Sequence, residues 1–156
     1  MDREYFSVAL SSNANLAIPL SSMGAVIQIE AQNICPIPGI ADFWHGTINF
    51  KGSLLWVLDS NRYFKLDNTN DYLNKYTAVI IQQDKSQASQ KIALIATKLL
   101  GIVSLKSESL SQLTEESSAL EQCCSGVNKD EAEPIFILDP SSLFERLYQS
   151  SALVSA

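Results

Sequence analysis

The sequence predicts an all-β fold, a barrel or a sandwich, and three observations support this prediction. Short β-favouring runs recur along the chain and are separated by clusters of turn-forming Ser, Asn, Asp and Gly. The middle of the chain holds two such runs, 47–50 and 54–58, and their connection through Gly52 indicates a tight hairpin. Helix signals, in contrast, are few.

The predicted strands follow one another with irregular spacing and without an internal repeat. In chain order they cover residues 5–10, 15–20, 25–30, 47–50, 54–58, 77–82, 92–96, 99–105 and 134–138. The Asn- and Asp-rich residues 65–71 are expected to form a loop between the two halves of the fold. Residues 107–122, rich in Ser, Glu and Gln, fit either a mobile loop or a marginal amphipathic helix, and residues 126–131 fit a hydrophilic turn.

One helix is expected near the C-terminus. Asp139 supplies a capping side chain, and Pro140 occupies the first helical position, where a backbone N–H is not needed. The apolar residues that follow fall on one face of a short helix: Leu143, Phe144, Leu147 and Tyr148. Residues 60–64, directly after Asp59, are expected to form a second short helical turn.

Length and composition fit one compact unit. The 156 residues suit a single domain over 1–156, with approximate lobes at 1–70 and 71–156 and exchange of strands allowed between them. Hydrophobic residues make up 46% of the chain, which is enough for a packed interior. The net charge is −6 and the 11 basic residues are scattered, which argues against binding to a nucleic-acid backbone.

The compartment signals favour a cytoplasmic protein. The charged residues 1–4 lead directly into a predicted strand, so we expect no signal peptide. No apolar run approaches the roughly 20 residues that a membrane-spanning helix needs. Three cysteines are an odd number, and two of them, Cys123 and Cys124, are neighbours, so we expect reduced thiols rather than a disulfide framework.

The residues that enzymes use are missing or isolated. His45 is the only histidine, and no Gly-x-Ser-x-Gly motif supplies a nucleophile for it to activate. The sequence contains no glycine-rich phosphate loop, and Cys123-Cys124 lacks the spacing of a redox or zinc motif. We therefore expect no catalytic residue, no metal and no cofactor, and we predict that the protein is not an enzyme.

The central segment carries a more specific pattern. In order along the chain it contains Pro38-Gly39, Phe43, Gly46-Thr47-Ile48-Asn49-Phe50-Lys51-Gly52 and Val57-Leu58-Asp59. This order resembles the central motif of CheW-like domains, the adaptor modules of bacterial chemosensory arrays. Trp44, just before the motif's first glycine, is similar to the variant of that family found in type IV pilus, or twitching-motility, systems. Residues 15–20, 92–95 and 136–143 resemble the family's flanking strands and closing helix.

The resemblance implies both a fold and a function. The implied fold is two small SH3-like five-stranded β-barrel lobes with a short C-terminal helix and an apolar groove between the lobes. The implied function is a non-enzymatic adaptor that couples a methyl-accepting chemoreceptor to a CheA-like histidine kinase in chemotaxis, phototaxis or pilus-motility signalling. The receptor's coiled-coil tip would dock in the groove, and the kinase's CheW-like regulatory domain would dock on another face. The protein would then act at the inner face of the membrane, within a receptor array.

The candidate partner-binding residues lie in the central hairpin and just before it. Asn49, Lys51 and Gly52 match the turn of the family motif, and their chemistry suits a turn, because Asn caps turns and Gly adopts positive φ. Phe43 and Trp44, at the entrance to the first strand, are candidate aromatic anchors for a partner.

Three positions depart from the pattern of the family. Lys51 stands where the family usually has Arg, and lysine cannot form a planar bidentate contact. The glutamate often found in the family's third strand falls near Ala25, and an Asp after its later leucine-rich strand falls at Thr97. These departures bear on receptor binding more than on the fold.

A second class of function stays open at this point. The chain could be a stand-alone CheW-like binding module for another regulatory protein, such as a response regulator or a pilus motor factor. Binding to the regulatory domain of a kinase would separate the two hypotheses. An enzyme would need turnover that is lost when His45 or a cysteine is replaced.

Overall fold

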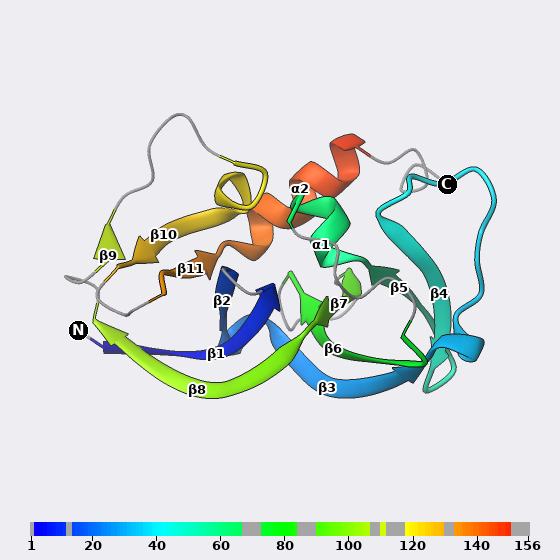
Figure 1. The fold of residues 1–156 in the computed structure, drawn as a ribbon, viewed down its shortest axis with the longest axis horizontal. Coiled ribbons are helices and arrows are strands. Elements are labelled where there is room, and N and C mark those ends of the chain that lie inside the picture. Colours follow the sequence, from blue (N-terminus) through cyan, green and yellow to red (C-terminus); the bar gives the residue numbers. More distant parts are fainter. Residues whose placement is uncertain are drawn as a thin grey trace.

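Two curled β-sheets lie side by side in the computed structural model (Figure 1). The structure describes residues 2–11, 14–66, 73–83, 90–106, 110–111, 118–129 and 133–150. One sheet contains β1 (Asp2–Ser11), β2 (Ala14–Pro19), β8 (Lys98–Lys106), β9 (Leu110–Ser111), β10 (Cys124–Asn128) and β11 (Ile135–Leu138). The other contains β3 (Met23–Glu30), β4 (Trp44–Phe50), β5 (Ser53–Leu58), β6 (Lys75–Gln82) and β7 (Lys91–Ala96).

The sheets do not follow the order of the chain. The strand orders are β8-β1-β2-β11-β10-β9 and β3-β6-β7-β5-β4, with parallel pairs β2/β11 and β5/β7 and antiparallel pairs elsewhere. Strands β1 and β2 therefore join the late strands of the chain, whereas β6 and β7 join β3 to β5. The chain passes from one sheet to the other through the short 3-10 turn η1 (Leu20–Ser22) and again through Thr97. Each sheet therefore contains strands from both the early and the late part of the chain.

The predicted strands are all present, but two further strands were missed. β9 adds a sixth strand to the first sheet, which was expected to have five. The predicted hydrophilic turn at 126–131 is wrong at its start, because Gly126, Val127 and Asn128 are buried in β10, and residues 130–131 lie outside the described residues. Pairing with β11 explains this difference, since Val127 lies opposite Phe136. Of the ambiguous segment 107–122, residues 110–111 form β9 and residues 118–122 are described, while the rest lies outside the described residues. Residues 118–122 lead into the 3-10 turn η4 (Glu121–Cys123) through a reciprocal cap between Ser118 and Glu121.

The central strands are buried on both faces, which explains their nearly continuous apolar sequence. In β6, Val79 and Ile81 face a core cluster that both sheets share, while Ala78 and Ile80 face a second cluster inside their own sheet. The shared cluster draws its side chains from both sheets, from the C-terminal helix and from Phe64 just after residues 60–63: Val8, Leu10, Leu16, Ile18, Leu58, Phe64, Val79, Ile81, Leu94, Leu138, Leu143 and Leu147.

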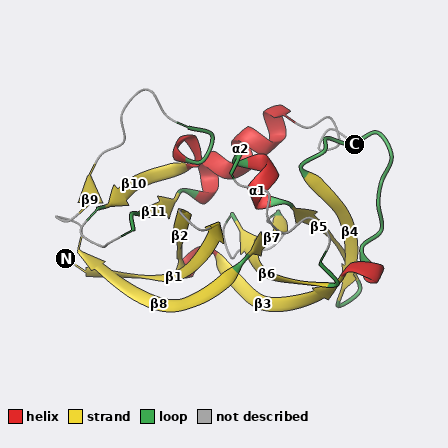
Figure 2. Cartoon of the chain, in the orientation of Figure 1, coloured by secondary structure: helices red, strands yellow, loops and turns green. Residues whose placement is uncertain are grey.

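The two helices lie near the middle of the molecule, where the two sheets meet (Figure 2). In α2 (Pro140–Ser150), Asp139 caps the N-terminus by accepting from Ser141 N at 3.2 Å and from the Ser142 hydroxyl at 3.0 Å. The predicted helix is confirmed, and Leu143, Phe144 and Leu147 of its predicted apolar face are buried. Tyr148, the fourth residue of that face, is 48% exposed. The short α1 (Ser60–Tyr63) follows Asp59, and a further 3-10 turn, η2 (Ala31–Asn33), ends the β3 segment.

Candidate partner-binding surface

The tip of the β4–β5 hairpin brings three of the predicted site residues together. Lys51 and Gly52 form a two-residue turn with φ of +52° and +83°, the type I′ geometry that matches the twist of paired strands. The Asn49 side-chain oxygen accepts a hydrogen bond from Gly52 N at 3.0 Å, which fixes the turn. The Lys51 ammonium lies 5.3 Å from the centre of the Phe50 ring. Asn49, Lys51 and Gly52 are exposed, so the tip is accessible to a partner.

The two aromatic candidates lie at the opposite end of β4. Trp44 is 6% exposed and packs in the shared core, with its ring 5.6 Å from that of Trp56. Phe43 is partly buried and contacts Tyr63 edge-on at 4.8 Å. The structure therefore separates the five predicted residues into an exposed tip and an aromatic cluster, and it gives Trp44 a core environment in place of a surface one.

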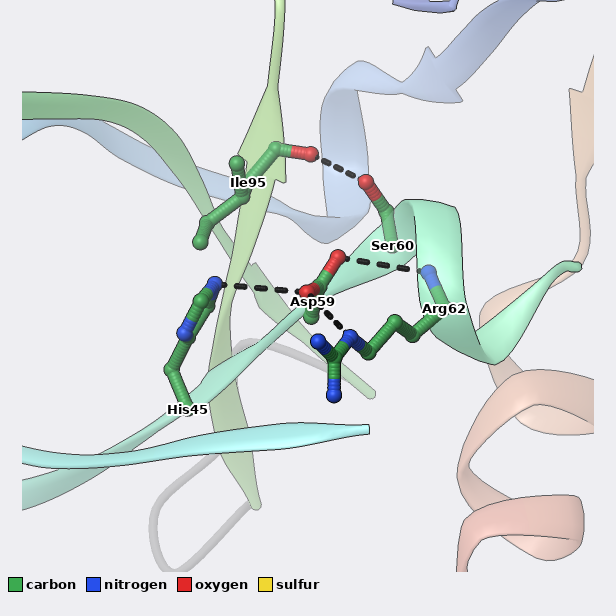
Figure 3. A network of polar contacts seen from close by, with 5 residues as sticks. All are labelled: His45, Asp59, Ser60, Arg62 and Ile95. Carbon is green, nitrogen blue, oxygen red and sulfur yellow. Dashed lines mark hydrogen bonds and ion pairs between the residues drawn. The ribbon is translucent and has the colours of Figure 1, made fainter. Parts of the chain in front are cut away.

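A polar network joins β4 to the start of α1 (Figure 3). Asp59 caps α1 by accepting from Arg62 N at 3.2 Å, and its other oxygen lies 3.4 Å from His45 Nε2 and 3.6 Å from Arg62 Nε. Asp59 is therefore the common partner of two basic side chains. No motif in the sequence predicts this network, because His45 and Asp59 are brought together by the pairing of β4 with β5.

This network is not a catalytic triad, although it contains Ser, His and Asp. The Ser60 hydroxyl donates to the Ile95 carbonyl, and Figure 3 shows it pointing away from the imidazole. A triad needs the serine hydroxyl hydrogen-bonded to the histidine and the carboxylate on the other ring nitrogen. Here His45 Nε2 faces Asp59. The arrangement ties α1 to β4 and β7 and prepares no nucleophile.

The outer strands β3 and β8 expose apolar side chains that the sequence reasoning did not single out. On β8, Ile102 is 65% exposed, and Leu99 and Leu100 are exposed as well. On β3, Val26 is exposed, and Ala25, at the position of the family's glutamate, lies beside it. The apolar run at 99–103, which only Gly101 interrupts, is the sequence signal for this surface, because a half-buried strand would alternate apolar and polar residues. Exposed apolar side chains that gather on one strand are typical of an interaction surface.

The cysteines differ in their environment. Cys123 is buried, and burial raises the pKa of its thiol from 9.0 to about 11. Burial also raises the pKa of Cys124, reinforced by the neighbouring Cys123, Glu121 and Asp139, and its thiol donates to the Leu120 carbonyl at 3.2 Å. Cys35 is exposed. Among the described residues, no group of three or more His, Cys, Asp or Glu is arranged to hold a metal ion.

We expect Cys35 to react with a thiol reagent in the folded protein while Cys123 and Cys124 stay protected, because the thiolate is the reactive form. Titration with a chromogenic disulfide reagent at pH 8 should detect one fast-reacting thiol per chain, and three after unfolding in urea. Cys35→Ser, the matched control, should abolish the fast phase. A fast phase that persists in this variant would contradict the assigned burial.

Comparison with models of protein families identifies the chain. The model of the CheW-like domain matches residues 4–147. The chain belongs to the CheW-like domain family. The scaffolding protein TtCheW from Thermoanaerobacter tengcongensis has a similar fold, with a TM-score of 0.73 and 17% sequence identity over 88% of this chain and 89% of that one. Comparison with curated proteins found no match.

The family assignment confirms the predicted fold class, an all-β CheW-like fold with two lobes and a short C-terminal helix. It also agrees with the prediction that this CheW-like domain is not an enzyme, since the family consists of adaptor modules in chemotaxis signalling. Within the described part of the chain, no helix has both the length and the apolar character needed to cross a membrane.

Proposed function

We propose that this CheW-like domain is a non-enzymatic adaptor that couples a chemoreceptor to a CheA-like histidine kinase within a receptor array in the cytoplasm. The observation that supports it best is the presence of two different accessible surfaces on one protein. One consists of the exposed apolar side chains of β3 and β8, and the other is the polar tip of the β4–β5 hairpin. An adaptor needs two such surfaces because it must hold two partners at once.

The apolar surface suits the receptor. The tip of a coiled-coil hairpin presents apolar side chains, and Ile102, Leu99 and Leu100 on β8 offer apolar area to bury against them. The hairpin tip suits the regulatory domain of the kinase, because β4 is an outer strand of its sheet and its tip can reach a second barrel. Lys51 adds a positive charge there, where the family usually has Arg.

Lys51→Glu should leave the fold intact and weaken binding of the kinase's CheW-like domain by roughly tenfold, since a central interface charge contributes more than about 1 kcal/mol. The exposed lysine contributes little to stability. Isothermal titration calorimetry with the purified kinase domain would measure the affinity. Lys129→Glu, an equal charge change at an exposed lysine beyond β10, is the control for net charge. An unchanged affinity in Lys51→Glu would remove Lys51 from the interface.

Ile102→Glu should weaken binding of the receptor tip by roughly tenfold, because it places a charge in the apolar contact. The melting temperature should change little, since Ile102 is 65% exposed in the unbound protein. The Lys51 and Ile102 variants control for each other: each should lose one partner and keep the other. If both variants lose both partners equally, the two proposed surfaces are not separate.

Affinity capture from the native cell with tagged protein would test the adaptor function as a whole. Recovery of a histidine kinase with a CheW-like domain together with a methyl-accepting receptor would support it and would name the pathway, chemotaxis, phototaxis or pilus motility. Recovery of a response regulator or a pilus motor factor without a kinase would favour the stand-alone binding module. The departures at Ala25, Lys51 and Thr97 make this second outcome worth a direct test.

A further inference from the structure

A pocket opens among four strands of the first sheet. Its volume is about 350 Å³, and its wall comes from the start of β1, from the end of β2 with η1, and from β10 and β11. These strands lie in the half of the molecule that holds the N-terminus (Figure 1). None of the described lining residues belongs to the two surfaces proposed above for partners. An apolar cavity of about 150 Å³ already holds a benzene ring, so this pocket has room for a small organic molecule.

The inner wall of the pocket is apolar. Ile137 is 3% exposed and belongs to a small core cluster inside this sheet, and Pro19 and Leu20 line the pocket as well. The cluster consists of Tyr5, Ala17, Leu105, Ile135 and Ile137. A ligand of this pocket therefore needs an apolar body that it can bury against the wall.

Tyr5 places a hydroxyl group in this apolar wall. The residue is 5% exposed and packs with Ile137 in the same cluster. Among the described residues, its hydroxyl has no hydrogen-bond partner, and its oxygen is not fully enclosed, so it is open to a group that enters the pocket. Buried polar groups in proteins nearly always have a partner. The Tyr5 hydroxyl thus marks the point at which a ligand would make a hydrogen bond.

Arg3 adds a positive charge at the entrance. Arg3 and Tyr5 lie two residues apart on β1, so their side chains point to the same face of the sheet, while Glu4 points to the other. Leu105, opposite Arg3 on β8, is buried in the inner cluster, which agrees with this orientation. Arg3 is exposed and Tyr5 is buried, so the charge lies nearer to solvent than the hydroxyl. A guanidinium and a phenol hydroxyl both donate hydrogen bonds, and a carboxylate accepts from both.

We propose that this pocket binds a small organic monocarboxylate with an apolar body. The carboxylate accepts hydrogen bonds from the Tyr5 hydroxyl and the Arg3 guanidinium, and the apolar body packs on Ile137, Leu20 and Pro19. A cationic ligand would be repelled by Arg3, and a neutral ligand would lose the charge-assisted part of the contact. The pocket thus adds a small-molecule site to a chain whose proposed partners are proteins.

Titration of the nitrogen-15-labelled whole chain with benzoate, followed by NMR, tests the proposal. Benzoate combines an aromatic ring with one carboxylate, and a Kd of about 1 mM is expected of so small a ligand. The backbone amides that shift should be those of the pocket, at 3–5, 20–21, 125 and 137–138. Benzamide, the neutral ligand of the same shape, should bind roughly tenfold more weakly, and benzylamine, the cation, should not saturate these shifts.

Two conservative variants separate the two polar contacts. Tyr5→Phe removes only the hydroxyl, so it should weaken benzoate binding roughly tenfold and leave the melting temperature unchanged. Arg3→Gln removes an exposed charge and should abolish the preference for benzoate over benzamide. The matched controls are Tyr148→Phe, at a phenol that is 48% exposed on α2, and Lys51→Gln at the hairpin tip. Both controls should bind benzoate as wild type does.

Three results would overturn the proposal. Wild type that shows no saturable shift at the pocket amides has no carboxylate site there. Benzamide that binds as tightly as benzoate would show that the charge is not recognised. Tyr5→Phe and Arg3→Gln variants that both bind benzoate as wild type does would remove the two residues from the contact. The adaptor function is measured with protein partners, so it stands or falls separately from each of these results.

Discussion

Replacement of Gly46 by alanine should lower the free energy of unfolding by about 3–5 kcal/mol. Gly46 has a φ of +142°, and a Cβ atom there would lie 2.3 Å from the carbonyl oxygen of Cys35. That oxygen accepts a hydrogen bond from Thr47 N at 2.9 Å, within a β-bridge that holds Cys35 against β4. The alanine methyl group therefore cannot be accommodated unless this bridge opens. Small domains have a total stability of about 5–15 kcal/mol, so the loss is severe.

Gly52→Ala separates the effect of this clash from that of backbone strain. Gly52 also has positive φ, but no atom lies within 4 Å of a Cβ placed there. Its replacement should therefore cost only the left-handed strain, about 1–2 kcal/mol. Urea unfolding of wild type and both variants, followed by tryptophan fluorescence, would give the three free energies. Equal losses for the two variants would contradict the steric explanation.

Phe64→Ala should lower the free energy of unfolding by about 3–5 kcal/mol. Phe64 follows α1 directly, is 1% exposed and packs in the cluster to which both sheets contribute. Its truncation should lower the melting temperature by about 6 °C or more, since each kcal/mol shifts a protein of this size by about 2–4 °C. Because the cluster is shared, calorimetry should still record a single transition.

Leu54→Ala is the control for this truncation, since Leu54 is 67% exposed on β5. Its effect on stability should stay within about 0.5 kcal/mol. Two separate transitions in Phe64→Ala, one for each sheet, would contradict the shared core. A loss as small as that of Leu54→Ala would contradict the assigned burial of Phe64.

Local signals account for the parts of the fold that could be predicted. The hairpin follows from Gly52 and the β-favouring runs on either side of it, and the start of α2 follows from Asp139-Pro140. Both depend on interactions between residues that are close in sequence. Strand β10 was missed because Cys124–Asn128 has no strand pattern of its own and is held by pairing with β11 and β9.

In the candidate site, too, the features that depend on residues close in sequence could be predicted, and those that depend on distant residues could not. The turn residues Asn49 and Gly52 take the conformations that their chemistry predicts. The environment of Trp44 depends on Trp56 and the shared core, so its sequence position alone did not separate core from surface.

The double crossing of the chain between the sheets has a mechanical consequence. Because η1 and Thr97 both carry the chain across, and Thr97 N donates to Ala9 O at 2.8 Å, the two sheets are joined at two points as well as through their common interior. Among the described residues, these two crossings and the common interior hold the two sheets against each other. In the proposed adaptor, a movement of the receptor bound at β8 would therefore displace the whole protein. The kinase bound at the β4–β5 tip would then respond to a change in the position of the adaptor, because the conformation of the adaptor stays the same.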